Sequence, residues 1–396
     1  MSRAATGSGR GQRATGLGAW LRALAAAGAV AGAGVLAQPV VPVDPALGES
    51  VVFVRSARLL PIDLETTVFR PPGEGPHPVA VINHGKDSGN NRMQPRARYL
   101  PAVREFLQRG WAVVVPMRQG FSHSGGSAVG EGCNIAANGQ AQAEDVRAVV
   151  AWLEKQPWAD AQRMVMLGQS HGGLTTLAYA QDPHPGFRVF VNFAGGLRYS
   201  AGGCPWETEL AVAFGRYGAR TRVPSLWFYG ENDSFFPPAV IGPAHEAYVR
   251  AGGPAELVAL GPFGLDAHGL FGSYTGLPLW WERVAARLAA AGLPTQVLHP
   301  QFSRRAGWMA RPAASGFAGV EEIERVPGLQ AAGRQGYRTF LGQQSPRAFA
   351  LSPEGAWGWA QGGEDPLRRA LDNCNRRGAG SCRLYAVDEE VVWQQP

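Results

Sequence analysis

The sequence predicts an α/β fold with a mostly parallel sheet covered by helices on both faces, followed by a smaller C-terminal α+β unit. Two observations between residues 50 and 299 predict the larger unit. Short runs rich in valine, isoleucine, leucine and phenylalanine alternate with longer stretches of helical periodicity. Several of these runs are apolar throughout, as expected for strands buried on both faces. Such alternation is typical of parallel strands joined by crossover helices.

Eight strands and five helices are expected in this region. The strands are placed at residues 51–54, 64–69, 78–83, 112–116, 164–168, 188–192, 225–229 and 256–260. The helices are placed at residues 97–108, 140–155, 173–179, 238–250 and 278–290. The segment 195–222 is expected to consist of loops.

A change of composition between residues 300 and 315 predicts a boundary, with a C-terminal module at 315–396. In this module, residues 347–351 and 357–361 flank a Ser-Pro-Glu-Gly turn and predict a hairpin. Asp365 is a suitable N-cap and Pro366 a suitable first helical residue, so a helix is expected to run through Cys374. Residues 383–387 are expected to form a further strand.

The N-terminus has the pattern of a secretory signal peptide. The first 37 residues contain four arginines and no acidic residue, and the small apolar stretch 23–36 ends in Val-Leu-Ala before Gln38. We predict a signal peptide at 1–37, cleaved after Ala37, which implies a secreted or periplasmic protein with no membrane span after cleavage. The alternative is a buried alanine-rich helix.

Composition excludes several other classes. The 396-residue chain is 45% hydrophobic and 17% charged, which indicates a globular protein with sizeable cores. Its formal charge of +6 arises from scattered arginines, because Lys86 and Lys155 are its only lysines. Since no basic stripe with interleaved aromatic residues is present, we expect a small-molecule partner and no nucleic acid. The sequence leaves the oligomeric state open.

The four cysteines favour disulfides over a metal site. They show no CxxC spacing and no histidines at zinc-ligand spacing, so no metal is expected. In an oxidising compartment two disulfides are the better interpretation. Four cysteines allow three pairings, and position along the chain favours Cys133 with Cys204 and Cys374 with Cys382.

The strongest catalytic signal is a Gly-x-Ser-x-Gly sequence at residues 168–172, placed between a predicted strand and a predicted helix. In such a turn small neighbours allow the strained backbone that exposes a nucleophilic serine, here Ser170. The following helix N-terminus offers N–H groups to an oxyanion. The alternative is a glycine-rich turn without a catalytic role.

At these residues the chain resembles the α/β-hydrolase superfamily, in particular its dienelactone-hydrolase-like and acetyl-hydrolase-like branches, over residues 50–298. The resemblance implies the chain order nucleophile, acid, histidine. Asp233 follows the strand 225–229 in a Gly-x-x-Asp sequence and is the expected acid, with Glu231 as the alternative. His268 follows the next strand and is the expected base, and Asp266 is expected to support its loop.

The resemblance also implies an oxyanion hole. The sequence His-Gly-Lys at residues 84–86 resembles the His-Gly loop of the family, so the backbone N–H groups of Lys86 and His171 are expected to face the oxyanion. The alternative for this loop is a turn without a catalytic role. The position of His171 beside the serine suits this backbone role better than proton transfer by its ring.

These features predict an exported serine hydrolase that cleaves carboxylic esters through an acyl-enzyme on Ser170 and needs no cofactor. Dienelactone itself is disfavoured as substrate, because the family's dienelactone hydrolases use a cysteine nucleophile. One alternative is a serine peptidase of the prolyl-oligopeptidase type, which we expect less because only about 50 residues precede the hydrolase region and leave no room for a propeller. Another is a catalytically silent binding protein. The C-terminal module resembles a small cysteine-bearing module of exported bacterial proteins, which implies no activity, and its tryptophans are expected to form a core.

Overall fold

The computed structural model describes residues 41–130, 132–303, 308–377 and 381–394. The predicted signal peptide at 1–37 lies outside the described residues. Within the described ranges, no helix is both long enough and apolar enough to cross a membrane.

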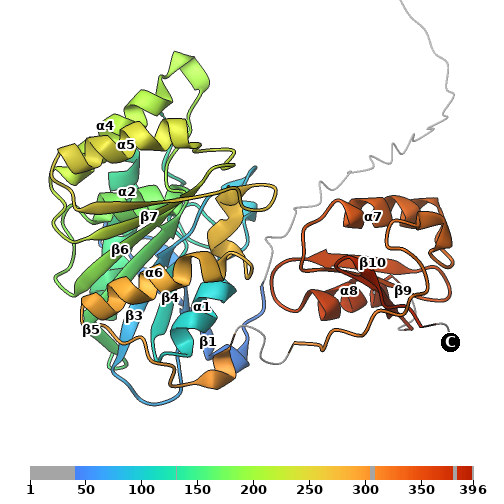
Figure 1. Ribbon diagram of the computed structural model, residues 1–396. Helices are drawn as coiled ribbons and strands as arrows, with labels where there is room; N and C mark the ends of the chain where they lie inside the picture. The colour runs from blue at the N-terminus through green and yellow to red at the C-terminus, as the bar shows by residue number, and fades with distance from the viewer. Residues whose placement is uncertain (1–40, 131, 304–307, 378–380, 395–396) are drawn as a thin grey trace, which may run out of the picture. The chain divides into compact units, whose positions relative to one another are not determined.

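The larger region is built on an eight-stranded sheet with the strand order β1-β2-β4-β3-β5-β6-β7-β8 (Figure 1). β1 and β2 pair antiparallel, as do β2 and β4, and the five remaining pairings are parallel. All eight predicted strands are present. Their bounds are β1 Glu49–Arg55, β2 Asp63–Phe69, β3 His77–Asn83, β4 Ala112–Pro116, β5 Ala159–Gln169, β6 Phe187–Phe193, β7 Ser225–Gly230 and β8 Ala255–Leu260.

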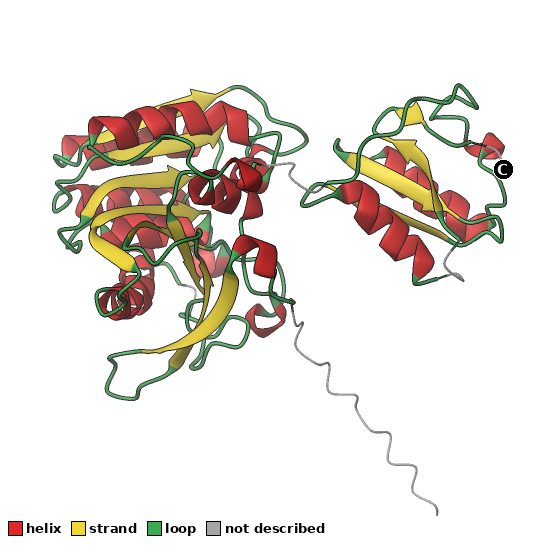
Figure 2. Ribbon diagram, turned by 90° about the horizontal axis from the view of Figure 1, so that it is seen from below, coloured by secondary structure: helices red, strands yellow, loops and turns green. Residues whose placement is uncertain are grey.

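Helices cover both faces of this sheet, which confirms the predicted class (Figures 1 and 2). One apolar core lies between the sheet and four helices, α2 (Ile135–Leu153), α3 (His171–Tyr179), α4 (Trp206–Gly218) and α5 (Pro238–Arg250). A second core lies on the opposite face beneath α1 (Leu100–Leu107) and α6 (Leu277–Ala290).

The expectation of loops throughout 195–222 is wrong, because α4 occupies the centre of that segment. Its buried residues Trp206, Leu210 and Phe214 recur every four positions and form an apolar stripe. Tyr217 extends the stripe by one further turn and donates a hydrogen bond from its hydroxyl to the carbonyl of Ala136 in α2 (2.8 Å). Packing against α2 therefore stabilises this short helix.

The C-terminal region is a separate four-stranded antiparallel sheet with the order β10-β9-β11-β12. Its strands are β9 Arg347–Leu351, β10 Trp357–Gln361, β11 Arg383–Val387 and β12 Glu390–Val391, and its helices are α7 Ala331–Leu341 and α8 Pro366–Asn375. The hairpin, α8 and β11 match the predictions, whereas α7 and β12 were not predicted. The two helices pack on opposite faces of the sheet (Figure 1). The Asp365 side chain caps α8 by accepting a hydrogen bond from the backbone N–H of Arg368 (3.1 Å).

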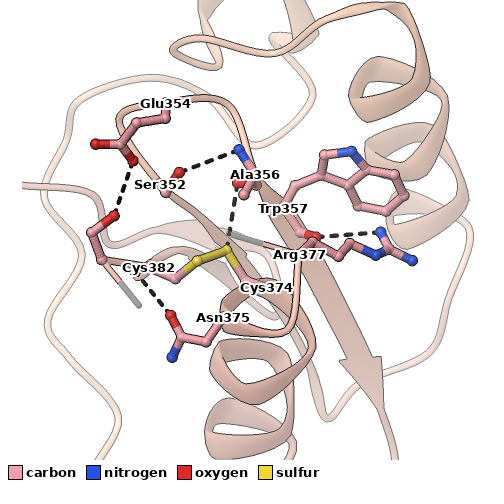
Figure 3. The surroundings of a disulfide bond; sticks show 9 residues. Ser352, Glu354, Ala356, Trp357, Cys374, Asn375, Arg377 and Cys382 are labelled. Atoms are coloured by element: carbon pink, nitrogen blue, oxygen red, sulfur yellow. Dashed lines mark hydrogen bonds between the residues drawn. A yellow bond between two sulfur atoms is a disulfide. The ribbon is translucent and has the colours of Figure 1, made fainter. Parts of the chain in front are cut away.

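Both predicted disulfides are present, and no cysteine is free. Cys133 and Cys204 are joined across 71 residues in the larger region, and Cys374 and Cys382 across eight residues in the smaller one. Figure 3 shows the second bridge between the end of α8 and the start of β11. Beside it, the backbone N–H of Cys382 donates to the side chain of Asn375 (3.2 Å), so a hydrogen bond supports the loop that the disulfide closes.

Candidate active site

Ser170 occupies the sharp turn between β5 and α3. Its backbone has φ 55° and ψ −123°, a conformation that side-chain-bearing residues rarely adopt. The turn is held on both sides, because the Ser170 N–H donates to the carbonyl of Phe193 in β6 (2.9 Å) and the Ser170 carbonyl accepts from the N–H of Gly173 (2.8 Å). A strained residue held by its surroundings in this way is typical of a functional position.

The two glycines of the motif are required by close packing. A Cβ at Gly172 would lie 2.0 Å from the carbonyl oxygen of Asn83 in β3, and a Cβ at Gly168 would lie 2.2 Å from the carbonyl oxygen of Gly172. Neither position therefore has room for a side chain. The close approach seats the start of α3 against the end of β3.

Asp233 and His268 form a hydrogen-bonded pair. Nδ1 of His268 lies 3.1 and 3.2 Å from the two carboxylate oxygens of Asp233. Oδ1 of Asp233 also accepts from the backbone N–H groups of Phe235 and Phe236, each at 2.9 Å. The Asp233 side chain is fully buried, whereas Glu231 is exposed to solvent. Of the two carboxylates considered from the sequence, the structure brings only Asp233 to the histidine.

The His-Gly-Lys loop lies against the serine. β3 and β5 are parallel neighbours with Asn83 opposite Gly168, so the segments that follow them leave the sheet side by side. A Cβ at Gly85 would lie 3.3 Å from Cβ of Ser170. The first N–H groups of α3, which include that of His171, have no acceptor within the helix. Lys86 and His171 thus flank Ser170 from two elements.

The ring of His171 points away from proton transfer. It is buried and lies within hydrogen-bond distance of the side-chain amides of Asn138 and Gln142 on α2. Burial lowers the pKa of His171 well below 6.5, and the positive charges of Arg118 and Lys86 lower it further. The ring is therefore neutral at physiological pH and anchors the start of α3 to α2.

His84 supports the same loop from below. Its Nε2 accepts a hydrogen bond from the backbone N–H of Arg118 (3.1 Å), so the ring proton is on Nδ1, which donates to the carbonyl of Gly85 (2.6 Å). Burial lowers the pKa of His84 well below 6.5, with a further contribution from the charge of Arg118. A neutral imidazole thus fixes the orientation of the Gly85 peptide group.

Two residues that the sequence analysis did not assign connect the parts of the site. The hydroxyl of Tyr99 accepts from the N–H of Gly85 (2.9 Å) and donates to Oε1 of Gln169 (3.2 Å). Nε2 of Gln169 donates to the carbonyl of His268 (3.0 Å). Gln169 lies inside the serine motif, but no sequence signal marks Tyr99, whose backbone is left-handed with φ 49°. Together they join the loop after β3, the serine turn and the histidine loop.

Ser170 and His268 open into one pocket with a volume of about 630 Å³. Its wall beside the histidine is apolar, because the Phe235 ring lies 4.4 Å from the His268 ring, measured between centroids. Other residues of the wall are Lys86, Tyr99, Leu100, Pro101 and Gln169. In the part of the chain that the structure describes, no group of three or more histidine, cysteine or carboxylate side chains could hold a metal ion.

Comparison with known families and structures gives one family match. The model of the X-Pro dipeptidyl-peptidases (S15 family) matches residues 62–221, which is less than half of the chain. The matched segment runs from β2 to the end of α4. It contains Ser170 but ends before Asp233 and His268. No curated protein matches the chain.

Solved structures similar to this chain include esterases and a peptidase. A putative dienelactone hydrolase from Klebsiella pneumoniae has 18% sequence identity and a TM-score of 0.44, over 61% of this chain and 98% of that one. An esterase from Pyrococcus furiosus has 16% identity and a TM-score of 0.47, over 64% and 98%. A puromycin-hydrolyzing peptidase from Mycobacterium tuberculosis has 20% identity and a TM-score of 0.44, over 62% and 39%.

Proposed function

We propose that this chain, an α/β hydrolase by its fold, is a serine hydrolase that cleaves carboxylic esters with Ser170 as nucleophile, His268 as base and Asp233 as the acid that orients the base. One observation carries the proposal. A serine in a strained turn shares a pocket with a histidine whose Nδ1 is bonded to a buried carboxylate. Such a histidine presents Nε2 in the tautomer that can accept a proton.

The reaction proceeds in two halves. In the first, Oγ of Ser170 bonds to the ester carbonyl carbon while its proton passes to Nε2 of His268. The tetrahedral intermediate then collapses, the bond to the alcohol oxygen breaks, and His268 returns the proton to the leaving alcohol. In the second half, water repeats the attack on the acyl-enzyme and releases the acid. Asp233 stabilises the imidazolium in both halves without taking the proton itself.

The oxyanion of each tetrahedral intermediate would be bound by the backbone N–H groups of Lys86 and His171. Gly85 packs against Ser170, and α3 begins at His171, which supports this assignment. Such donors act in the transition state, where the charge develops, and losing one typically costs roughly 3 to 4 kcal/mol of barrier. No metal or organic cofactor takes part in this chemistry.

A second candidate is a serine peptidase, favoured by the match to the X-Pro dipeptidyl-peptidase family over residues 62–221. The same three residues could cleave an amide, with His268 protonating the leaving amine. An export pathway is proposed for either activity, because two disulfides are typical of an extracellular or periplasmic protein.

A substrate panel distinguishes these activities. We expect the purified protein to react with a fluorophosphonate probe at Ser170 and to hydrolyse p-nitrophenyl esters of short acyl chains. We expect kcat/KM for alanyl-prolyl-p-nitroanilide to be at least about 100-fold lower than for the best ester. The reverse order would favour the peptidase, and failure to react with probe, ester and anilide would favour a catalytically silent binding protein.

A further inference from the structure

The hydrogen bond between Asp233 and His268 joins two loops that follow different strands. Asp233 lies three residues after the end of β7, and His268 lies eight residues after the end of β8. The backbone ladder between these strands extends to the bond from the N–H of Glu231 to the carbonyl of Leu260 (3.0 Å). Side chains that connect the loops beyond this point therefore set the distance between acid and base.

The carboxylate of Asp266 makes this connection. Its Oδ1 accepts from the backbone N–H of His268 (2.9 Å) and from the backbone N–H of Ser234 (3.1 Å). Its Oδ2 accepts from the hydroxyl of Ser234 (2.6 Å). Ser234 directly follows Asp233, so one carboxylate binds the backbone of the base and the residue next to the acid.

A second side chain ties the loops on the other side of Asp233. Oδ1 of Asn232 accepts from the N–H of Phe263 (2.9 Å), and its Nδ2 donates to the carbonyl of Gly264 (3.0 Å). Both residues that flank Asp233 therefore hold the histidine loop. The acid is bracketed by two cross-loop contacts.

The Asp266 contact is made by a charged group. Partial burial alone would raise the pKa of Asp266, but hydrogen bonds from Ser234 and from the N–H of His268 outweigh it, and the pKa lies below its ordinary value of 3.8. The carboxylate is therefore ionised at neutral pH. Hydrogen bonds to an ionised acceptor are roughly twice as strong as those between neutral groups.

We propose that Asp266, acting through Ser234, is a positioning residue that holds His268 in register with Asp233. This inference rests on the proposed function and deepens it. A local role as the N-cap of the short helix η4 (Ala267–Gly272) would need only the bond from His268. The two bonds from Ser234, 32 residues away, are what such a cap does not require. Of the described residues that line the substrate pocket, neither Asp266 nor Ser234 is one, so both act on substrate only through the pair.

The test compares four variants with the wild-type protein on one activated short-chain ester. Ser234→Ala keeps the charge of Asp266 and removes one cross-loop bond. Asp266→Asn weakens all three bonds. Ser234→Thr keeps the hydroxyl and, because Ser234 is exposed, has room for the added methyl group. Ser273→Ala is the matched control, since Ser273 follows the same histidine loop but bonds to Thr275.

We expect kcat to fall about 10-fold in Ser234→Ala and about 30- to 100-fold in Asp266→Asn, because small displacements of reacting groups cost up to about 100-fold in rate. KM should stay within about twofold, and the rate of fluorophosphonate labelling should fall in parallel with kcat. Ser234→Thr should recover most of kcat, and the control should match wild type. The double variant Ser234→Ala/Asp266→Asn should be no slower than Asp266→Asn alone within about twofold, because both changes break the same contact.

Thermal unfolding of each variant separates misfolding from misplacement, and the exposed Ser234 provides the variant that is expected to fold in every case. An active wild-type protein whose kcat is unchanged in Ser234→Ala and Asp266→Asn would overturn the positioning role alone. So would a loss that appears in KM instead of kcat, or one that Ser234→Thr does not restore. A wild-type protein inert toward ester and probe would overturn the proposed function, and the positioning role with it.

Discussion

The two sheets of this protein use their polar side chains differently. In the eight-stranded sheet, β3, β5, β7 and β8 run in the same direction, so the segments that follow them gather at one edge. Ser170, Asp233 and His268 each follow one of these strands. In the antiparallel four-stranded sheet, consecutive strands end at opposite edges. Parallel strands can therefore bring distant residues into one site, as the crevice at the carboxyl ends of α/β sheets commonly does.

Polar side chains of the smaller sheet close their own turns instead. The buried guanidinium of Arg347 donates to the carbonyls of Phe340 and Gln343 (2.9 and 2.8 Å) at the end of α7. The hydroxyl of Ser352 accepts from the N–H of Ala356 (3.2 Å) in the hairpin turn, as Figure 3 shows. The comparison predicts that substitutions in the first region affect activity, whereas those in the second affect stability.

The largest contrast is expected between two serines. Ser170→Ala and His268→Ala should each lower kcat by at least about 10⁴-fold without unfolding the protein, and the double variant should be little worse, because the residues act as a unit. Ser352→Ala should leave kcat unchanged and lower the free energy of unfolding by about 1 kcal/mol. Ester hydrolysis and urea unfolding measure the two effects. Full turnover by Ser170→Ala would exclude the serine mechanism.

Within the larger region, the two carboxylates after β7 should differ next most. Asp233→Asn should slow turnover by about 10² to 10⁴-fold, because the amide no longer fixes the productive tautomer of His268. The exposed Glu231→Gln should stay within about twofold of wild type. Steady-state kinetics of both variants measure the difference. Equal losses, or a larger loss in Glu231→Gln, would reassign the acid.

The disulfides provide a third comparison. Replacing both Cys133 and Cys204 with alanine opens a loop of 71 residues and should cost about 4 kcal/mol of stability. Replacing Cys374 and Cys382 opens a loop of eight residues and should cost about 2 to 3 kcal/mol. Urea unfolding measures both costs, and a larger cost for the second pair would contradict the chain-entropy argument.

Only the first disulfide should also affect the enzyme. Cys133 lies two residues before α2, the helix whose Asn138 and Gln142 contact His171. Its loss should therefore change kcat/KM by a few-fold, while loss of the second bridge should leave kcat/KM unchanged.

Acid should destabilise the two regions unequally. All eight histidines lie between residues 77 and 299. His84 and His171 have pKa values well below 6.5 in the folded protein because they are buried, whereas in the unfolded chain they titrate near 6.5. Below pH 6.5 the unfolded chain therefore binds protons that the folded protein does not. The stability present above pH 6.5 is lost as the pH falls, by up to about 1.4 kcal/mol per pH unit for each histidine.

Hydrogen exchange at pH 7.5 and 5.5, corrected for intrinsic rates, resolves this effect by region. Protection should fall more within residues 41–303 than within residues 308–394. His171→Gln, which retains a polar side chain toward α2, should reduce the difference. Equal loss of protection in both regions would show that other groups govern the acid response.

Several parts of the fold could be predicted from local sequence. The eight strands of the large sheet are apolar runs bounded by turns, and α8 begins with the Asp365 cap and Pro366. The serine turn was predictable because its glycines answer to contacts made by the motif itself and by the adjoining strand. The helix α4 was missed although its apolar stripe is present, since the surrounding segment is rich in glycine and polar residues.

The order of Ser170, Asp233 and His268 along the chain, the cysteine pairings and the exclusion of a zinc site from cysteine spacing came from the sequence by itself. Only the tertiary structure decided that Asp233 and not Glu231 meets His268, that Tyr99 bridges Gly85 and Gln169, and that Asp266 reaches Ser234. Periodicity, caps and motifs record interactions between residues a few positions apart. These three contacts span 14 to 70 residues and depend on which strands lie side by side, so they form only when the sheet has assembled.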